Sequence, residues 1–504
     1  MSGPPFLDRG DVLARSTLWN LIGQSSPALV ALFAIPFLIK GLGTDRFGIL
    51  TLAWTLVGYF SLFDFGLGRA LTQVVSERIG QSRGHEIADI VWTATYLMVL
   101  LGVAAAAVMA MLSPWLVTRV LKIPSSLQTE TLHALLVLAA GIPIVTAHAG
   151  LRGVLEAWLR FDLTNAVRIP MGILTFVVPL CVLPFSRSLF VVVAALVAVR
   201  AGGCLVQLIL CVRTVPGLRL IARPRVEAVV PLLRFGSWMT VSNIVSPLMV
   251  SLDRFVIGAM ISMAAVAYYS TPYEAVTKFL LIPAALVGVL FPAFSRSFVQ
   301  DRADTQQLFR RGAKVVALAL FPLCLLTVAF GREALAIWLG HNFADRSTRV
   351  LQLLAIGVFL NGLANVPFAL IQAVGRPDIT AKLHLLELPA YLATLWWLVH
   401  SWGIVGAAAA WVARVAVDAL VLFIVAERSL KMARATATRL LLGLAAVLMA
   451  LGWWTDSVGL VPRVLVTAVA LLVFGVIGWS WILGGDDRVL FTRGLRALRA
   501  QGSR

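Results

Sequence analysis

Apolar segments of about 20 residues follow one another along almost the whole chain, and this is the length that an α-helix needs to cross a membrane. Hydropathy predicts fourteen such spans. They cover residues 17–39, 47–68, 89–112, 131–151, 169–185, 189–211, 236–260, 266–294, 315–339, 350–373, 384–401, 404–426, 439–455 and 464–483. Charged residues make up 13% of the chain, about half the usual share, which excludes a soluble, disordered or secreted disulfide-rich protein. The sequence therefore predicts an all-α polytopic membrane protein.

Lysine and arginine are distributed unevenly between the two sides that these spans define. With a cytoplasmic N-terminus, 29 of the 42 basic residues fall in cytoplasmic segments and 8 in external ones. Cytoplasmic loops of membrane proteins carry such an excess, so we expect both termini in the cytoplasm. The net charge of +18 resides in these short clusters, and no nucleic-acid partner is expected. The basic tail suits anionic lipids of the inner leaflet.

A weak internal repeat divides the chain. Residues 13–27 (LARSTLWNLIGQSSP) are similar to residues 232–247 (LLRFGSWMTVSNIVSP), and each copy opens a span. Parallel six-span repeats occur in secondary transporters, so we expect two pseudo-symmetric six-helix lobes plus two C-terminal helices. The expected parts are a cytoplasmic N-terminal segment at 1–14, an N-lobe at 15–211, a cytoplasmic linker at 212–235, a C-lobe at 236–426, two further helices at 439–483 and a basic cytoplasmic tail at 484–504.

Charges inside the predicted spans are candidates for function, because a charge in the hydrocarbon costs about 3 kcal/mol or more. Arg200 lies in the middle of a span whose helix carries no acid. Asp253 and Arg254 are adjacent, so they point about 100° apart and cannot pair face to face. We expect Arg200, Arg254 and the neighbouring Asp253 to line a substrate cavity in which the arginines bind an anion. Interhelical ion pairs, such as one between Arg200 and Asp253, are the alternative.

Two further pairs of oppositely charged residues inside the predicted spans can form ion pairs. Glu274 and Lys278 are four residues apart, and so are Arg414 and Asp418. Residues at this spacing share one face of a helix and can form an ion pair. Lys278 is also a candidate ligand for the anion in the cavity.

Several acids are candidates for ion coupling. Asp64 and Glu387 lie near the ends of their spans, and His384 precedes Glu387 by about one helical turn. A helix-end hydrogen bond for Asp64 and interfacial solvation for Glu387 are the simpler interpretations, and a titrating His–Glu pair is the functional one. Glu274 and Asp418 complete the set of candidate ion-coupling groups. No metal or cofactor is expected, because the four cysteines lie inside apolar runs and lack the spacing of metal ligands.

Sequence motifs punctuate most of residues 15–300. They are Ile35-Pro36 through GLGTDRFGIL, then FSLFDFGLGRALTQ, SLDRFVIGAM, AYYSTPYEAV and LFPAFSR. In these motifs and their order the chain resembles the Wzx-type O-antigen flippases, in the polysaccharide-exporter branch of the multidrug/oligosaccharidyl-lipid/polysaccharide superfamily. The resemblance implies two six-helix lobes around a central cavity. It also implies movement of undecaprenyl-pyrophosphate-linked oligosaccharides from the inner to the outer leaflet of a bacterial inner membrane. A polysaccharide polymerase or chain-length protein is a further candidate partner.

The sequence motifs do not distinguish between the different transport functions of this superfamily. A pyrophosphate head group needs arginine or lysine, which Arg200, Arg254 and Lys278 supply, whereas a cavity for drug cations would be lined by acids and aromatic residues. The alternative is an ion-coupled multidrug exporter or an exporter of another lipid-linked precursor, such as lipid II. A membrane glycosyltransferase or polymerase would need catalytic residues on a sizeable external domain, and the external loops are short. We therefore expect a transporter and not an enzyme.

Overall fold

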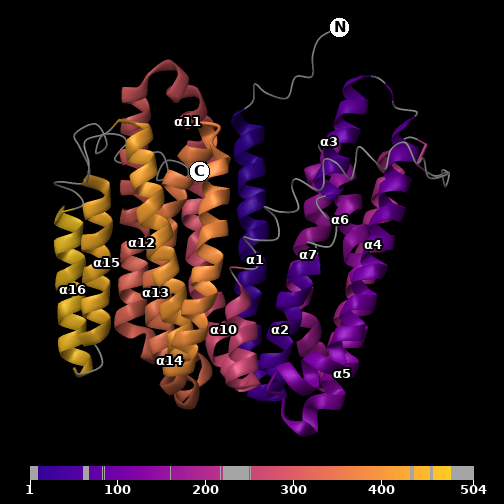
Figure 1. Ribbon diagram of the computed structural model, residues 1–504, viewed down its shortest axis with the longest axis horizontal. Helices are drawn as coiled ribbons and strands as arrows, with labels where there is room; N and C mark the ends of the chain where they lie inside the picture. Colours follow the sequence, from indigo (N-terminus) through magenta and orange to yellow (C-terminus); the bar gives the residue numbers. More distant parts are fainter. Residues whose placement is uncertain are drawn as a thin grey trace, which may run out of the picture. The chain divides into compact units, whose positions relative to one another are not determined.

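A computed structural model shows the described parts of the chain as helices (Figure 1). The structure describes residues 10–60, 67–81, 83, 86–158, 160–215, 217–218, 249, 251–431, 436–454 and 458–477. Within these ranges there is no β-strand, and eight helices are long and apolar enough to cross a membrane. The chain divides into two compact units, one made of Met1–Thr271 with Val399–Ile404, the other of Pro272–Leu398 with Val405–Arg504.

The first unit contains α1 to α8, the helical stretch 251–260 and most of α10. The bounds are α1 Gly10–Leu42, α2 Thr44–Phe60, α3 Leu67–Gly80, α4 Ile87–Trp115, α5 Ser125–Ala140, α6 Ile142–Ala157, α7 Phe161–Val182, α8 Leu189–Thr214 and α10 Met263–Thr277. Its core lies among α3, α4, α6 and α8, where apolar side chains such as Leu71, Val91, Val154 and Cys211 are buried. Burial of this shared apolar surface holds the four helices together.

The second unit contains α11 to α16, except for Val399–Ile404 in the middle of α14. The bounds are α11 Leu281–Gln300, α12 Arg302–Leu339, α13 His341–Ala373, α14 Pro377–Ser429, α15 Thr436–Trp454 and α16 Leu460–Ile477. Helix α13 packs along α12 (Figure 1) and also contacts α11 and α15. It is therefore buried on most of its faces, as expected for a helix that is apolar all round.

Every predicted span coincides with helix wherever the structure describes it, apart from a few residues at span ends and one turn inside the fourth span. Gly141 makes that turn, between α5 and α6. The tight connection predicted after the fifth span is confirmed, because α7 ends at Val182 and α8 begins at Leu189. The break predicted at 401–404 is also confirmed: Gly403 has φ 60° and ψ −136°, so α14 consists of two helices, 377–402 and 404–429.

Other parts of the predicted organisation stay predictions. The second copy of the repeat at 232–247 and the basic tail at 484–504 lie outside the described residues, as does most of the linker at 212–235. The limits of the N-lobe and C-lobe are likewise untested.

Inside the first unit, the start of α10 is joined closely to the start of α2. Oδ1 of Asp45 accepts a hydrogen bond from the backbone N–H of Ala264 at 3.1 Å. Gly48 lies so close to the carbonyl of Met263 that a Cβ at this position would collide with it. The GLGTDRFGIL motif thus supplies both a hydrogen-bond acceptor and a glycine that this close approach requires.

Candidate functional site

Asp253 and Arg254 connect the stretch 251–260 to two neighbouring helices of the first unit. The fully buried Asp253 accepts hydrogen bonds from the Tyr269 hydroxyl on α10, at 2.5 Å, and from the backbone N–H of Arg254, at 2.8 Å. The guanidinium of Arg254 donates from Nη1 to Oγ1 of Thr55 on α2, at 3.3 Å. Tyr59, one helical turn further along α2, forms a hydrogen bond with Ser251. Both predicted charges therefore lie in a buried polar network between helices.

Arg200 has a different environment. It is half-buried near the middle of α8 and forms no hydrogen bond or ion pair with any residue in the described ranges. The ion pair between Arg200 and Asp253, considered as an alternative, is therefore not formed. His148 on α6 lies close enough to interact electrostatically with Arg200, and it also interacts with Arg152. Among the described residues Arg200 thus has no counterion inside its predicted membrane span, and an anionic ligand could supply one.

Glu274 and Lys278 form the ion pair that their spacing predicts. The Lys278 ammonium lies 3.2 Å from Oε2 of Glu274, and the two side chains are 43% and 45% exposed. Asp64, in contrast, lies outside the described residues.

Arg414 and Asp418 do not form the ion pair that their spacing allows. Oδ1 of Asp418 instead lies 3.7 Å from Nε2 of His384, on the first half of α14. The Arg414 guanidinium lies over the ring of Tyr391, 5.6 Å from its centroid. Glu387 is buried, so interfacial solvation does not describe it. Partners on the opposite half of α14 replace the local pair, because the turn at Gly403 brings the two halves into contact.

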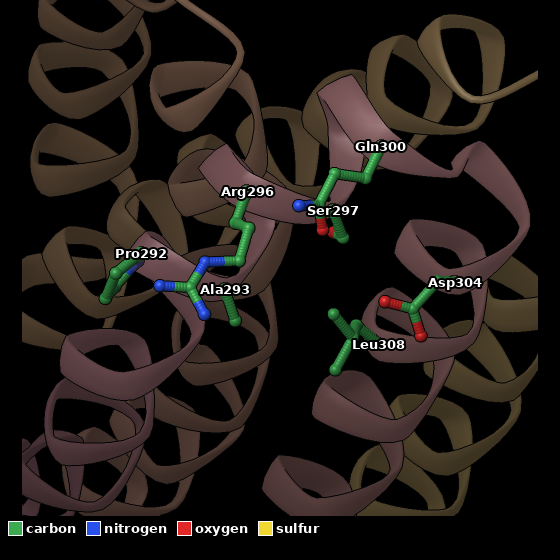
Figure 2. A pocket seen from close by; sticks show the side chains of 7 residues that line it. All are labelled: Pro292, Ala293, Arg296, Ser297, Gln300, Asp304 and Leu308. Carbon is green, nitrogen blue, oxygen red and sulfur yellow. The ribbon is translucent and has the colours of Figure 1, made fainter.

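A pocket of about 360 Å³ lies where α11 meets α12, and sequence reasoning missed it. Figure 2 shows Arg296 and Asp304 on opposite sides of it. Its lining residues are Pro292, Ala293, Arg296, Ser297, Gln300, Asp304 and Leu308. The LFPAFSR motif supplies three of them, which was the available sequence signal. Because its two charges are opposite and exposed, the pocket does not favour a polyanion.

Comparisons with known proteins agree with this architecture. Residues 41–348 match the family model described as polysaccharide biosynthesis protein. A Shigella flexneri protein named as an O-antigen transporter is 33% identical over 413 residues, which is 81% of this chain and 96% of that protein. The lipid II flippase MurJ, in an inward closed conformation, matches with a TM-score of 0.71 at 12% identity over 91% of this chain and 98% of its own.

An inward-facing multidrug resistance MATE family transporter of the MOP superfamily matches with a TM-score of 0.66 at 14% identity, over 82% of this chain and 94% of its own. At these identities the structural likeness establishes the fold, which is the polytopic helical fold that the sequence predicts. The family is established by the sequence matches, and the family resemblance seen in the motifs is confirmed. The chain belongs to the polysaccharide biosynthesis protein family of membrane transporters.

Proposed function

We propose that this protein is a flippase that moves undecaprenyl-pyrophosphate-linked oligosaccharide units across the bacterial inner membrane for the synthesis of a surface polysaccharide. The observation that carries the proposal is Arg200, a cation inside a membrane span that has no counterion among the described residues. The pyrophosphate of such a substrate is a strong anion, and a guanidinium binds its oxygens in a bidentate manner. Arg254 is the second candidate ligand, and Lys278 a third.

The expected mechanism is alternating access. The pyrophosphate and sugars bind the basic side chains, and the polyprenyl tail stays in the lipid. The N-lobe at 15–211 then rocks against the C-lobe at 236–426, as in secondary transporters built from two repeats. Since the sequence carries no nucleotide-binding motif, the energy has to come from an ion gradient or from downstream consumption of the sugar by a polymerase.

Deletion of the gene in the native host tests this function. We expect the mutant to lose its surface glycan and to accumulate undecaprenyl-linked repeat units on the cytoplasmic side, and a plasmid copy to restore export. Lipid extracts and glycan blots measure both effects. Unchanged surface glycan together with lost drug resistance would instead assign the chain to multidrug export.

Orientation in the membrane gives a second prediction. In a cysteine-free background, single cysteines at Thr44, Ser125 and Asp345 are expected to react with an impermeant thiol reagent added to intact cells, because the distribution of basic residues places these positions outside. Cysteines at Ser82, Arg223 and Arg434 are expected to react only after permeabilisation. Labelling at Arg223 in intact cells would contradict the fourteen-span topology.

A further inference from the structure

Three ionisable side chains meet between the two halves of α14. His384 and Glu387 lie on the first half and Asp418 on the second, and their side-chain nitrogen and oxygen atoms come within 4.8 Å of one another. Asp418 is the closer acid to His384, at 3.7 Å between Oδ1 and Nε2. All three residues belong to the second unit, so the cluster is a feature of one compact body.

Within this cluster, Glu387 is the residue whose environment indicates a bound ligand. Its exposed fraction is 8%, and neither of its carboxylate oxygens accepts a hydrogen bond from a residue in the part of the chain that the structure describes. A buried carboxylate without donors is costly as an anion. The cost disappears when the group takes up a proton or faces an added cation.

The charged groups around Glu387 would be balanced by one additional positive charge. The charges that act on Glu387 are those of Asp418 and Arg414, from the second half of α14. His384, on the same half as Glu387, lies beside Asp418, and α13 contributes the uncharged ring of Phe368, which stacks on His384 with centroids 6.4 Å apart. With a neutral histidine, two carboxylates face one guanidinium. With both acids ionised, and counted over the described residues, the cluster would carry one uncompensated negative charge inside a predicted membrane span.

We propose that this cluster binds one exchangeable proton on Glu387, and that the proton couples transport to the proton gradient. The inference rests on the proposed function, because a proton site can drive transport only in a transporter. Protonation adds H⁺ from water to a carboxylate oxygen of Glu387 and removes the uncompensated charge, and deprotonation returns H⁺ to water and restores it. No other bond forms or breaks.

A proton suits the cluster better than a metal cation. Hard metal ions are held by a shell of about six or more oxygen ligands, whereas this cluster offers two carboxylates and an imidazole. The fixed guanidinium of Arg414 would also repel a second permanent cation. A proton needs only one oxygen atom. Its uptake also removes the repulsion between Glu387 and Asp418, so the two halves of α14 pack differently in the two protonation states.

Infrared difference spectroscopy of the full-length protein in liposomes tests the proposal. During a pH titration, the wild-type protein is expected to show the carbonyl stretch of a protonated carboxyl group, which disappears on deprotonation. Glu387→Gln is expected to remove this band and Glu387→Asp to restore one. The matched control is Asp345→Asn, which removes a carboxylate that is 54% exposed beside Arg332, and it is expected to keep the band.

The possible results separate the proposal from its alternatives. A band that persists in Glu387→Gln overturns it, and so does loss of the wild-type band when NaCl, but not KCl, is added at constant pH, which would indicate a sodium site. The readout uses no glycan, so its failure leaves the flippase function standing. In the deletion host, Glu387→Gln is expected to lower surface glycan by about tenfold or more. Normal export by this variant would overturn the coupling role.

Discussion

Arg200→Met is expected to lower surface glycan by about 10- to 100-fold while the protein stays in the membrane at its normal level. A hydrogen bond to a charged group contributes about 1.5–3 kcal/mol, and about 1.4 kcal/mol corresponds to a factor of ten. Methionine keeps an unbranched apolar chain of similar reach and removes only the charged group. Glycan blots of the complemented deletion strain, normalised to immunoblots of the protein, measure the effect.

The thermal stability of the Arg200→Met protein is expected to rise although its export activity falls. Because Arg200 has no counterion among the described residues, removing its charge from the span is expected to raise the unfolding temperature of the purified protein by a few degrees. Arg200→Lys is expected to keep part of the activity. The matched control is Arg213→Ala, at the exposed last turn of α8, which should change neither quantity. A lower unfolding temperature with normal export would assign Arg200 to packing.

Arg254→Ala is expected to lower glycan export by a similar factor of about 10 to 100, for the same reason. Arg254→Lys is expected to be partly active, since an ammonium keeps the charge but not the planar fork that matches phosphate oxygens. Thr55→Val is the informative partner, because it removes the contact with the Arg254 guanidinium and keeps both the arginine and the shape of the neighbouring side chain. We expect this variant to export within about twofold of wild type.

The comparison of these variants separates two roles of Arg254. If Thr55→Val is as defective as Arg254→Ala, the contact between α2 and the stretch 251–260 is what matters, and Arg254 positions a helix. If only the arginine substitution is defective, its charge acts on the substrate. Protein level and unfolding temperature, measured for each variant, exclude a general folding defect.

The helices could be predicted from the sequence because the thickness of the membrane fixes their length and because polar and glycine-rich turns interrupt the apolar segments. The turn before Leu189 and the break at Gly403 are local features of this kind. The ion pair of Glu274 with Lys278 was predictable for the same reason, since both partners lie on one helix at a spacing that sets their geometry.

Contacts between distant segments could not be predicted in this way. The spacing of Arg414 and Asp418 indicated a local pair, but His384 and Tyr391 from the opposite half of α14 replace it. The burial of Glu387 and the hydrogen bond from Tyr269 to Asp253 likewise depend on how helices pack. Hydropathy shows where a span begins and ends along the sequence. These contacts depend instead on which face of a helix packs against a neighbouring helix.

The turn at Gly403 also limits how the length of this chain can change during evolution. Loops ordinarily accept insertions and deletions, but this connection holds a single residue in a conformation that side chains with a Cβ avoid. One inserted residue would rotate the second half of α14 by about 100° relative to the first, which would carry Asp418 away from His384. A change in the length of this connection is therefore expected to disrupt the cluster as much as a substitution of one of its charged residues.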